Sequence, residues 1–121
     1  MAERIPALLV NDPEKAAEFY VEVLGMTVEE AAPMWILALE SERVRLIEAA
    51  RADLELGVSG EAGDSGCRLM TSRIQLLHER AELHGVVSRK NRLRRTRWGS
   101  DEFTAEDPDG NMITFWSVSV T

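Results

Sequence analysis

The stretch that decides the fold is residues 5–26, which read IPALLVNDPEKAAEFYVEVLGM. It opens with a short apolar run, Ile5 to Val10, that is typical of a buried strand. Pro6 stands at the start of this run, where a strand tolerates the loss of one backbone donor. Asn11 or Asp12 then offers a side-chain oxygen to cap the first turn of a helix. The stretch therefore predicts a strand that passes directly into a helix.

The predicted helix begins with Pro13, whose ring favours the first helical position, and it ends at Gly25. Between these residues, apolar side chains recur at helical spacing, so one face of the helix is expected to be buried. Further apolar runs, separated by a proline and by a polar turn, predict three strands after the helix. These strands are Met26–Ala31, Trp35–Glu40 and Val44–Ala49.

The second half of the chain repeats this order of elements. Cys67 to Thr71 predicts a strand, Ser72 is expected to cap a second helix, and Gly85 ends that helix. Three weaker strands are predicted after it, at Val86–Arg89, Glu102–Glu106 and Met112–Val118. The pattern indicates an internal structural repeat.

A single α+β domain over residues 1–121 follows from this repeat. We expect a first module at residues 1–50, a glycine-rich linker at 51–65 and a second module at 66–121. Each module reads strand, helix and three strands. Because neither module buries both faces of its own sheet, the two are expected to pair around a shared concavity.

The composition is that of an ordinary globular chain, with 45% hydrophobic and 29% charged residues. No apolar run is long enough to cross a bilayer, and the amino terminus lacks the apolar core of a signal peptide. Cys67 is the only cysteine, which excludes an internal disulfide. These features predict a cytoplasmic protein, in which Cys67 is a small buried hydrophobe rather than a nucleophile.

The net charge of −7 conceals an asymmetry along the chain. Six of the nine residues from Arg89 to Arg97 are basic, whereas the rest of the chain holds 8 basic and 21 acidic residues. Such a run is either a solvated loop or a contact for phosphate groups. The acidic remainder disfavours general binding of nucleic acid and suits ligands that carry positive charge.

Two blocks of sequence carry a family likeness. The first runs from Val10-Asn11-Asp12-Pro13 through Phe19-Tyr20 to Leu24-Gly25-Met26, and the second joins Trp98-Gly99 and Glu102-Phe103 to Asp107-Pro108-Asp109-Gly110-Asn111. Together they resemble the glyoxalase/bleomycin resistance/dioxygenase (vicinal oxygen chelate) superfamily, and within it the bleomycin-binding resistance proteins. The resemblance implies two βαβββ modules that form a curved mixed sheet around a cleft.

In metal-dependent members of that superfamily, His, Glu or Gln side chains from four strands bind a divalent ion in the cleft. The corresponding positions here are Ile5, Arg45, Gly66 or Cys67, and Thr114. Isoleucine cannot coordinate an ion, and arginine is a fixed cation that repels one. His78 and His84 fall in the second helix and at its end, away from these positions. We therefore expect neither a metal nor another cofactor.

The resemblance also implies residues that bind a ligand. Trp98-Gly99 matches the Trp-Gly of the bleomycin-binding branch, whose tryptophan helps to form the ligand groove, and Trp35 is expected to face the same cleft. Arg45 and Thr114, at vacant metal positions, are expected to line it. Indole rings suit planar ligands through stacking and cations through the ring face.

Other candidates receive a structural interpretation from the sequence. Trp116 is expected in the core, and four strand-associated carboxylates are expected to be solvent-facing charges rather than general bases, namely Glu40, Glu48, Glu102 and Glu106. Pro6 matches a proline associated, in the bleomycin-binding branch, with exchange of the amino-terminal strand between subunits. This match predicts a homodimer in which that strand can be swapped.

The leading hypothesis is a metal-free protein that sequesters an aromatic antibiotic or metabolite. Because the surface is acidic, this ligand can also be a cation. The alternative is a small-molecule enzyme of the same superfamily, of the isomerase, lyase or dioxygenase type. A third hypothesis makes the run from Arg89 to Arg97 a docking site for a phosphorylated or nucleic-acid partner.

Overall fold

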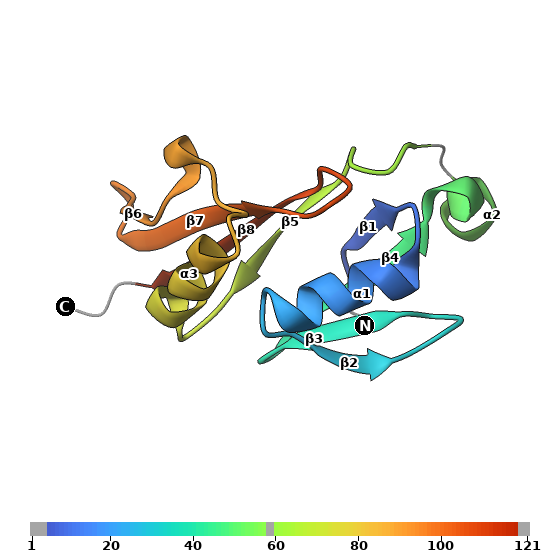
Figure 1. The fold of residues 1–121 in the computed structure, drawn as a ribbon, viewed down its shortest axis with the longest axis horizontal. Helices are drawn as coiled ribbons and strands as arrows, with labels where there is room; N and C mark the ends of the chain where they lie inside the picture. Colours follow the sequence, from blue (N-terminus) through green and yellow to red (C-terminus); the bar gives the residue numbers. More distant parts are fainter. Residues whose placement is uncertain (1–4, 58–59, 119–121) are drawn as a thin grey trace.

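The computed structural model describes residues 5–57 and 60–118. The elements follow one another along the chain as shown in Figure 1. They are β1 (Ala7–Val10), α1 (Pro13–Glu22), β2 (Thr27–Glu30), β3 (Ile36–Leu39), β4 (Glu42–Glu48), the 3₁₀ turn η1 (Ala49–Arg51), α2 (Ala52–Leu56), β5 (Gly66–Met70), α3 (Ile74–Leu83), the 3₁₀ turn η2 (Arg89–Asn91), β6 (Arg94–Arg95), β7 (Ser100–Glu106) and β8 (Met112–Val118). Within these ranges no helix is long and apolar enough to cross a membrane.

The strands form two mixed sheets of four strands, in the orders β1-β4-β3-β2 and β5-β8-β7-β6. In each sheet the first strand pairs in parallel with the last strand of its module, and the other pairs are antiparallel. A parallel pair requires a crossover connection, which α1 and α3 begin. Each half of the chain is therefore a βαβββ-like module, as the repeat in the sequence predicts.

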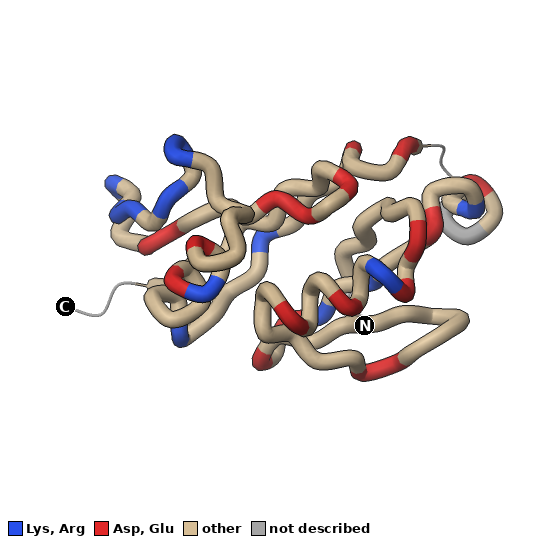
Figure 2. The backbone as a smooth tube through the Cα atoms, viewed as in Figure 1, with Lys and Arg blue, Asp and Glu red and all other residues tan. Residues whose placement is uncertain are grey.

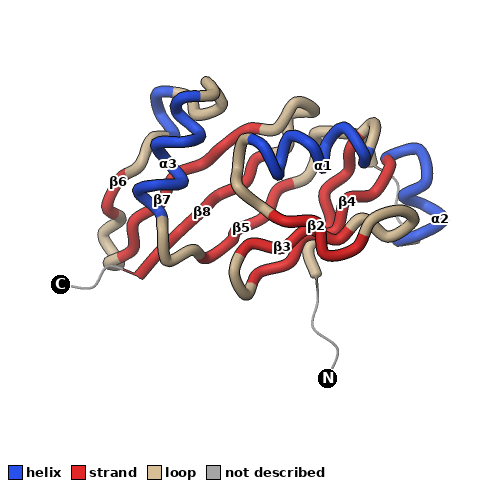
Figure 3. The backbone as a smooth tube through the Cα atoms, turned by 60° about the horizontal axis from the view of Figure 1, so that its bottom comes forward, coloured by secondary structure: helices blue, strands red, loops and turns tan. Residues whose placement is uncertain are grey.

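The helices α1 and α3 lie on the same side of the strands (Figure 3). They cover a core of alternate strand residues, among them Leu46 in β4, Phe103 in β7 and Phe115 in β8, which are at most 2% exposed. The intervening strand residues point to the opposite side. We call this side, which α1 and α3 leave uncovered, the open face.

The start of α1 confirms the cap that the sequence offers. The carboxylate of Asp12 accepts hydrogen bonds from the backbone N–H groups of Glu14 (3.1 Å) and Lys15 (3.3 Å). Pro13 is the first helical residue. The helix begins there because its first free donors are satisfied by a side chain next to the proline.

The Asp-Pro-Asp-Gly turn joins the two modules through buried hydrogen bonds. The hydroxyl of Tyr20, in α1, donates to Oδ2 of Asp107 at 2.7 Å. Asn111 donates both to Asp107 Oδ2 and to the carbonyl of Leu9 in β1, each at 2.9 Å. Burial and the neighbouring Asp107 raise the pKa of Tyr20 far above its ordinary value, so its hydroxyl remains a donor. The turn thus connects the second module to the first.

Two local predictions are wrong. The cap residue of α3 is Arg73, because the hydroxyl and N–H of Ser72 donate instead to the carboxylate of Glu40. The expected strand at Val86–Arg89 is absent from the described chain, and the short edge strand lies at Arg94–Arg95. The segment between the modules contains the short helix α2, whose Ala52 packs against β1 and β4, and its role as a linker stays a prediction.

Candidate functional site

The open face of the second sheet carries polar and aromatic side chains. Along β7 and β8 the buried apolar residues alternate with Glu102, Thr104, Thr114 and Trp116. The side chains of Thr104 and Thr114 hydrogen-bond across the two strands at 2.8 Å. Strand periodicity therefore gathers these groups on the side that α3 leaves uncovered.

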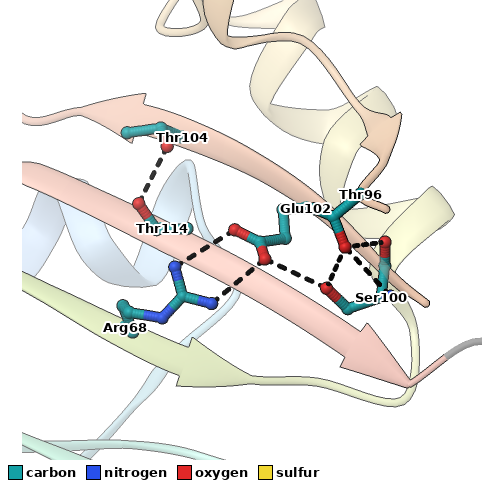
Figure 4. Close-up of polar contacts among 6 residues, drawn as sticks. All are labelled: Arg68, Thr96, Ser100, Glu102, Thr104 and Thr114. Atoms are coloured by element: carbon teal, nitrogen blue, oxygen red, sulfur yellow. Dashed lines mark hydrogen bonds and ion pairs between the residues drawn. The ribbon is translucent and has the colours of Figure 1, made fainter. Parts of the chain in front are cut away.

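An ion pair spans β8 on this face. Arg68 in β5 donates from both terminal nitrogens to the two carboxylate oxygens of Glu102 in β7, each at 3.1 Å (Figure 4). The register explains the geometry, since Arg68 lies opposite Thr114 and Glu102 lies opposite Trp116 on the intervening strand. A bidentate pair of this kind is stronger and more directional than a single contact.

Glu102 is the enclosed partner of this pair. Its side chain is 8% exposed, whereas that of Arg68 is 54% exposed. The hydrogen bond from Arg68 lowers the pKa of Glu102, with further hydrogen bonds from Ser100 and Trp98, and this outweighs the opposing effect of burial. Glu102 is therefore held as a carboxylate, and the expectation that it is a solvent-facing charge is wrong.

The hydroxyl groups of Ser100 and Thr96 form a hydrogen-bonded chain that ends at the carboxylate of Glu102. Ser100 donates to its Oε2 at 3.0 Å, and Thr96 lies 2.9 Å from the Ser100 hydroxyl (Figure 4). Thr96 also closes the turn between β6 and β7 through its backbone N–H, 2.7 Å from the carbonyl of Ser100. In this turn Gly99 has φ +92°, a left-handed conformation that favours glycine, and Trp98 stands beside it.

Two tryptophans border a hollow of about 260 Å³ over this network. Its lining is formed by Arg68, Trp98, Gly99, Ser100, Trp116 and Val118, and we call it the two-tryptophan hollow. Trp98 is 69% exposed, while Trp116 is half-buried on the open face. The expectation of Trp116 in the core is therefore wrong, because its strand register turns it away from α3.

The predicted ligand residues are only partly brought together. Trp98 and Gly99 line the two-tryptophan hollow, and Thr114 lies on the same face. Trp35 instead packs against the helix-covered core and lines a shallow groove beside α1. Trp35 was expected to face the same cleft as Trp98, and it lies on the helix-covered side instead. Its role in ligand binding stays a prediction. Arg45 lies in β4, opposite Ala7 and Ile36.

Pro6 directly precedes β1, and its carbonyl accepts a hydrogen bond from the backbone N–H of Arg45 at 2.9 Å. β1 pairs with β4 of the same chain. The role of Pro6 in a subunit interface stays a prediction.

The four positions counted as metal sites hold no converging donor set. Cys67 points to the core side of β5, and burial, followed by the charges of Glu42 and Asp107, raises the pKa of its thiol to about 12. Thr114 is engaged with Thr104, and Ile5 lies before β1. In residues 5–57 and 60–118, no group of three His, Cys, Asp or Glu side chains is placed to hold an ion.

A larger groove of about 830 Å³ lies between the end of α1, the edge of the first sheet and α3. Several of its polar groups join the two modules. Glu40 accepts hydrogen bonds from Thr71 and Ser72, and Arg80 donates to the carbonyls of Val21 and Glu22 at the end of α1. The lining includes no aromatic ring, so the smaller hollow has the groups better suited to a planar ligand.

The basic run lies on η2, β6 and the turn that follows, at the end of the molecule where Figure 2 shows the Lys and Arg residues gathered. Arg92 forms an ion pair with Glu82 (3.1 Å), and Arg95 forms one with Asp101 (2.6 Å). All six basic residues are exposed. Two residues within the basic run fix it to the rest of the protein: Leu93 packs against the core, and Thr96 is buried.

Sequence reasoning did not select Arg68, Ser100 or Trp116 for the site. One signal was available, since polar residues alternate with apolar ones from Glu102 to Glu106 in β7. Such alternation places Glu102 and Thr104 on the face opposite Phe103. The partner of Glu102 could not be found this way, because Arg68 lies 34 residues away in sequence.

Comparisons with known proteins agree with this architecture. Residues 5–115 match the Glyoxalase/Bleomycin resistance protein/Dioxygenase superfamily. Bleomycin resistance proteins of Geobacillus stearothermophilus and Staphylococcus aureus are each 29% identical to the chain, with 96% of both sequences covered.

Solved structures share the fold. TioX from Micromonospora sp. ML1 aligns with a TM-score of 0.81 at 16% identity, covering 98% of this chain and 99% of TioX. A glyoxalase/bleomycin resistance protein from Streptomyces sp. CB03234 aligns with a TM-score of 0.76 at 23% identity, covering 94% and 98% of the two chains.

Proposed function

The chain belongs to the glyoxalase/bleomycin resistance protein/dioxygenase superfamily, and from this premise we propose that it sequesters an aromatic small molecule, an antibiotic or a metabolite. The observation that carries the proposal is the two-tryptophan hollow, where Trp98 and Trp116 stand beside the guanidinium of Arg68. The bleomycin resistance proteins among its relatives favour an antibiotic as the ligand.

The hollow has the properties of a binding surface. Indole rings contribute large apolar contact areas at little cost in side-chain entropy, and stacking adds about 0.5–1.5 kcal/mol beyond area burial. The hydroxyl groups beneath are already paired with Glu102 and with each other. The polar network therefore holds the floor of the hollow in place before a ligand arrives.

Binding accounts for this site better than catalysis does. An isomerase or lyase would need a group that takes up or releases a proton near neutral pH. Glu102 lies opposite Trp116 and accepts a hydrogen bond from Trp98, and Arg68 holds its pKa low. The ion pair is thus suited to a structural role, and sequestration needs no chemical step.

We further propose that the protein works as a homodimer in which a second copy covers the open face. This face leaves Met70, Met112 and Val118 between 38% and 62% exposed. A sheet covered on one side only is stabilised by a second layer. Closure by a second copy would also deepen a hollow that is shallow in one chain.

Titration of the protein with bleomycin and a panel of planar antibiotics and metabolites tests the proposal. A ligand should raise the melting temperature and quench indole fluorescence. Trp98→Ala should weaken binding by about tenfold or more, because lost stacking and lost apolar contact add together.

Trp35→Phe is the matched control, since Trp35 lies on the helix-covered side. It should leave the affinity within about twofold of the wild type. A ligand that binds Trp98→Ala normally but fails to bind Trp35→Phe would place the site beside α1 and refute the proposed one.

A further inference from the structure

The exposed charge of the two-tryptophan hollow is a cation. Arg68 and Glu102 neutralise each other formally, but Arg68 exposes about half of its side chain while Glu102 is covered. Both oxygens of the carboxylate accept hydrogen bonds from Arg68, and one also accepts from Ser100. A ligand in the hollow therefore meets N–H groups rather than the carboxylate.

Arg68 retains donors for such a ligand. An arginine has five N–H groups, and the pair with Glu102 uses one from each terminal nitrogen. Neither hydrogen bond to Glu102 uses the Nε of Arg68. The edge of the guanidinium that includes Nε is thus available for an oxyanion.

Two more arginines lie close to this position. Arg68 also lines an adjoining hollow of about 330 Å³, whose other charged lining residues are Glu42 and Arg43, the latter paired with Glu29. On the other side, Arg94 in β6 lies directly opposite Glu102 in β7. Paired residues on neighbouring strands project to the same side, so Arg94 shares the open face.

We propose that the ligand of this site is an aromatic oxyanion, a planar ring system that carries a carboxylate or a similar anionic group. The ring lies against Trp98 and Trp116, and the anion binds the free edge of Arg68. Of the described residues that line the two-tryptophan hollow, none is acidic. The inference rests on the proposed function and narrows its ligand class, against the preference for a cation that the total charge of −7 suggests.

Three isosteric probes test the sign of the charge. 2-Naphthoate, 2-naphthamide and 2-naphthamidinium share one ring and a planar substituent, and they are anionic, neutral and cationic near neutral pH. Their affinities are measured by calorimetry at low and at high salt. We expect 2-naphthoate to bind about tenfold more tightly than the amide, with the amidinium weakest, and added salt should reduce this preference.

Two variants assign the preference to the ion pair. In Arg68→Met the carboxylate of Glu102 is left without its partner, so the preference should reverse in favour of 2-naphthamidinium. In the double variant Arg68→Met/Glu102→Gln both charges are gone, and the three probes should bind within about twofold of one another. Arg89→Met removes a basic residue of η2, outside the hollow, and should keep the wild-type order.

The outcomes separate this inference from the proposed function. If binding depends on Trp98 but the amide or the amidinium binds as tightly as 2-naphthoate or more tightly, the ligand is not an oxyanion. The aromatic site would then still be supported. Failure of all three probes to bind would refute the aromatic site, and the oxyanion with it. Retention of the anion preference in the double variant would also refute the role given to Arg68.

Discussion

Trp98 and Trp116 reach the same hollow by different routes. Trp98 stands in a tight turn beside Gly99, is 69% exposed, and donates a side-chain hydrogen bond to Glu102. Trp116 belongs to a central strand and faces the hollow through the alternation of β8. A residue whose position depends on strand register is harder to assign from sequence than one in a turn.

Trp116→Leu should therefore affect binding more than folding. The change keeps an apolar side chain on the open face but removes a stacking partner, which is worth about 0.5–1.5 kcal/mol and so about two- to tenfold in affinity. The affinity for an aromatic ligand and the urea midpoint of the variant are measured together. Unchanged affinity with a large loss of stability would show that Trp116 acts in packing rather than in ligand binding.

Tyr20 is the residue on which the joint between the modules most depends. It is 0% exposed, and its hydroxyl is 2.7 Å from Oδ2 of Asp107. Tyr20→Phe removes this donor and leaves a buried carboxylate oxygen with a weaker set of partners. We expect the free energy of unfolding to fall by about 1–3 kcal/mol in urea denaturation.

Asn11→Ala provides the matched control for this prediction. Asn11 donates an exposed hydrogen bond of 2.7 Å to Asp109, between the same two modules. Loss of this hydrogen bond should lower the free energy of unfolding by less than about 0.5 kcal/mol, because water replaces the partner at the surface. Equal costs for both variants would contradict the view that the buried bond dominates the joint.

At the scale of elements, the start of α3 is completed by the first module. The carboxylate of Glu40, which follows β3, accepts hydrogen bonds from the Thr71 hydroxyl at 2.5 Å and from both the N–H and the hydroxyl of Ser72. Burial works against the charge of Glu40, but these hydrogen bonds outweigh it and lower its pKa. Glu40, at the end of β3 in the first module, thereby fixes the conformation of the residues that lead into α3 of the second module.

A pH dependence follows from this contact. Because the pKa of Glu40 is lower in the folded state than its ordinary value of 4.5, its contribution to stability is complete above that value. The contribution is lost as the pH falls through the folded-state pKa. Glu40→Gln should therefore reduce stability at neutral pH and flatten its decline on acidification, as measured by urea midpoints from pH 7 to pH 3.

Glu79→Gln removes one exposed carboxylate from α3 itself and controls for the change in net charge. The acid decline of this variant should follow that of the wild type. If both variants flattened the curve equally, net charge rather than the contact with Thr71 and Ser72 would be responsible.

At the scale of the whole molecule, the side of the two sheets opposite α1 and α3 is covered, within the described chain, only where α2 packs on Leu9 and Ile47. The helices α1 and α3 shield the other side (Figure 3), and the exposed apolar residues of β5 and β8 lie on the open face. We expect a dimer at micromolar concentration in sedimentation experiments. A monomer under these conditions would contradict the proposed assembly.

Met112→Arg should dissociate the dimer, because it places an unpaired charge on the surface to be buried. Leu83→Arg is the control, since Leu83 is 87% exposed on α3, away from the open face. Dissociation by Leu83→Arg, with Met112→Arg still dimeric, would place the interface on the helix side.

The sequence by itself determined the elements whose causes are local. The strand-to-helix passage at residues 7–22 followed from a cap at Asn11 or Asp12 and from helical periodicity, and the repeat of this pattern predicted two βαβββ modules. The family likeness followed from short motifs in turns and caps. Such features depend on neighbouring residues, so they can be recognised without knowledge of long-range contacts.

Only the tertiary structure decided which distant residues meet. The pairing of Arg68 with Glu102 depends on the register of β5 and β7 against β8. The orientation of Trp35 toward α1 and of Trp116 toward the open face, and the contact of Glu40 with Ser72, depend on how the modules and strands pack. A shift of one residue in register would send each strand side chain to the opposite face, and turn and cap motifs carry no information about that register.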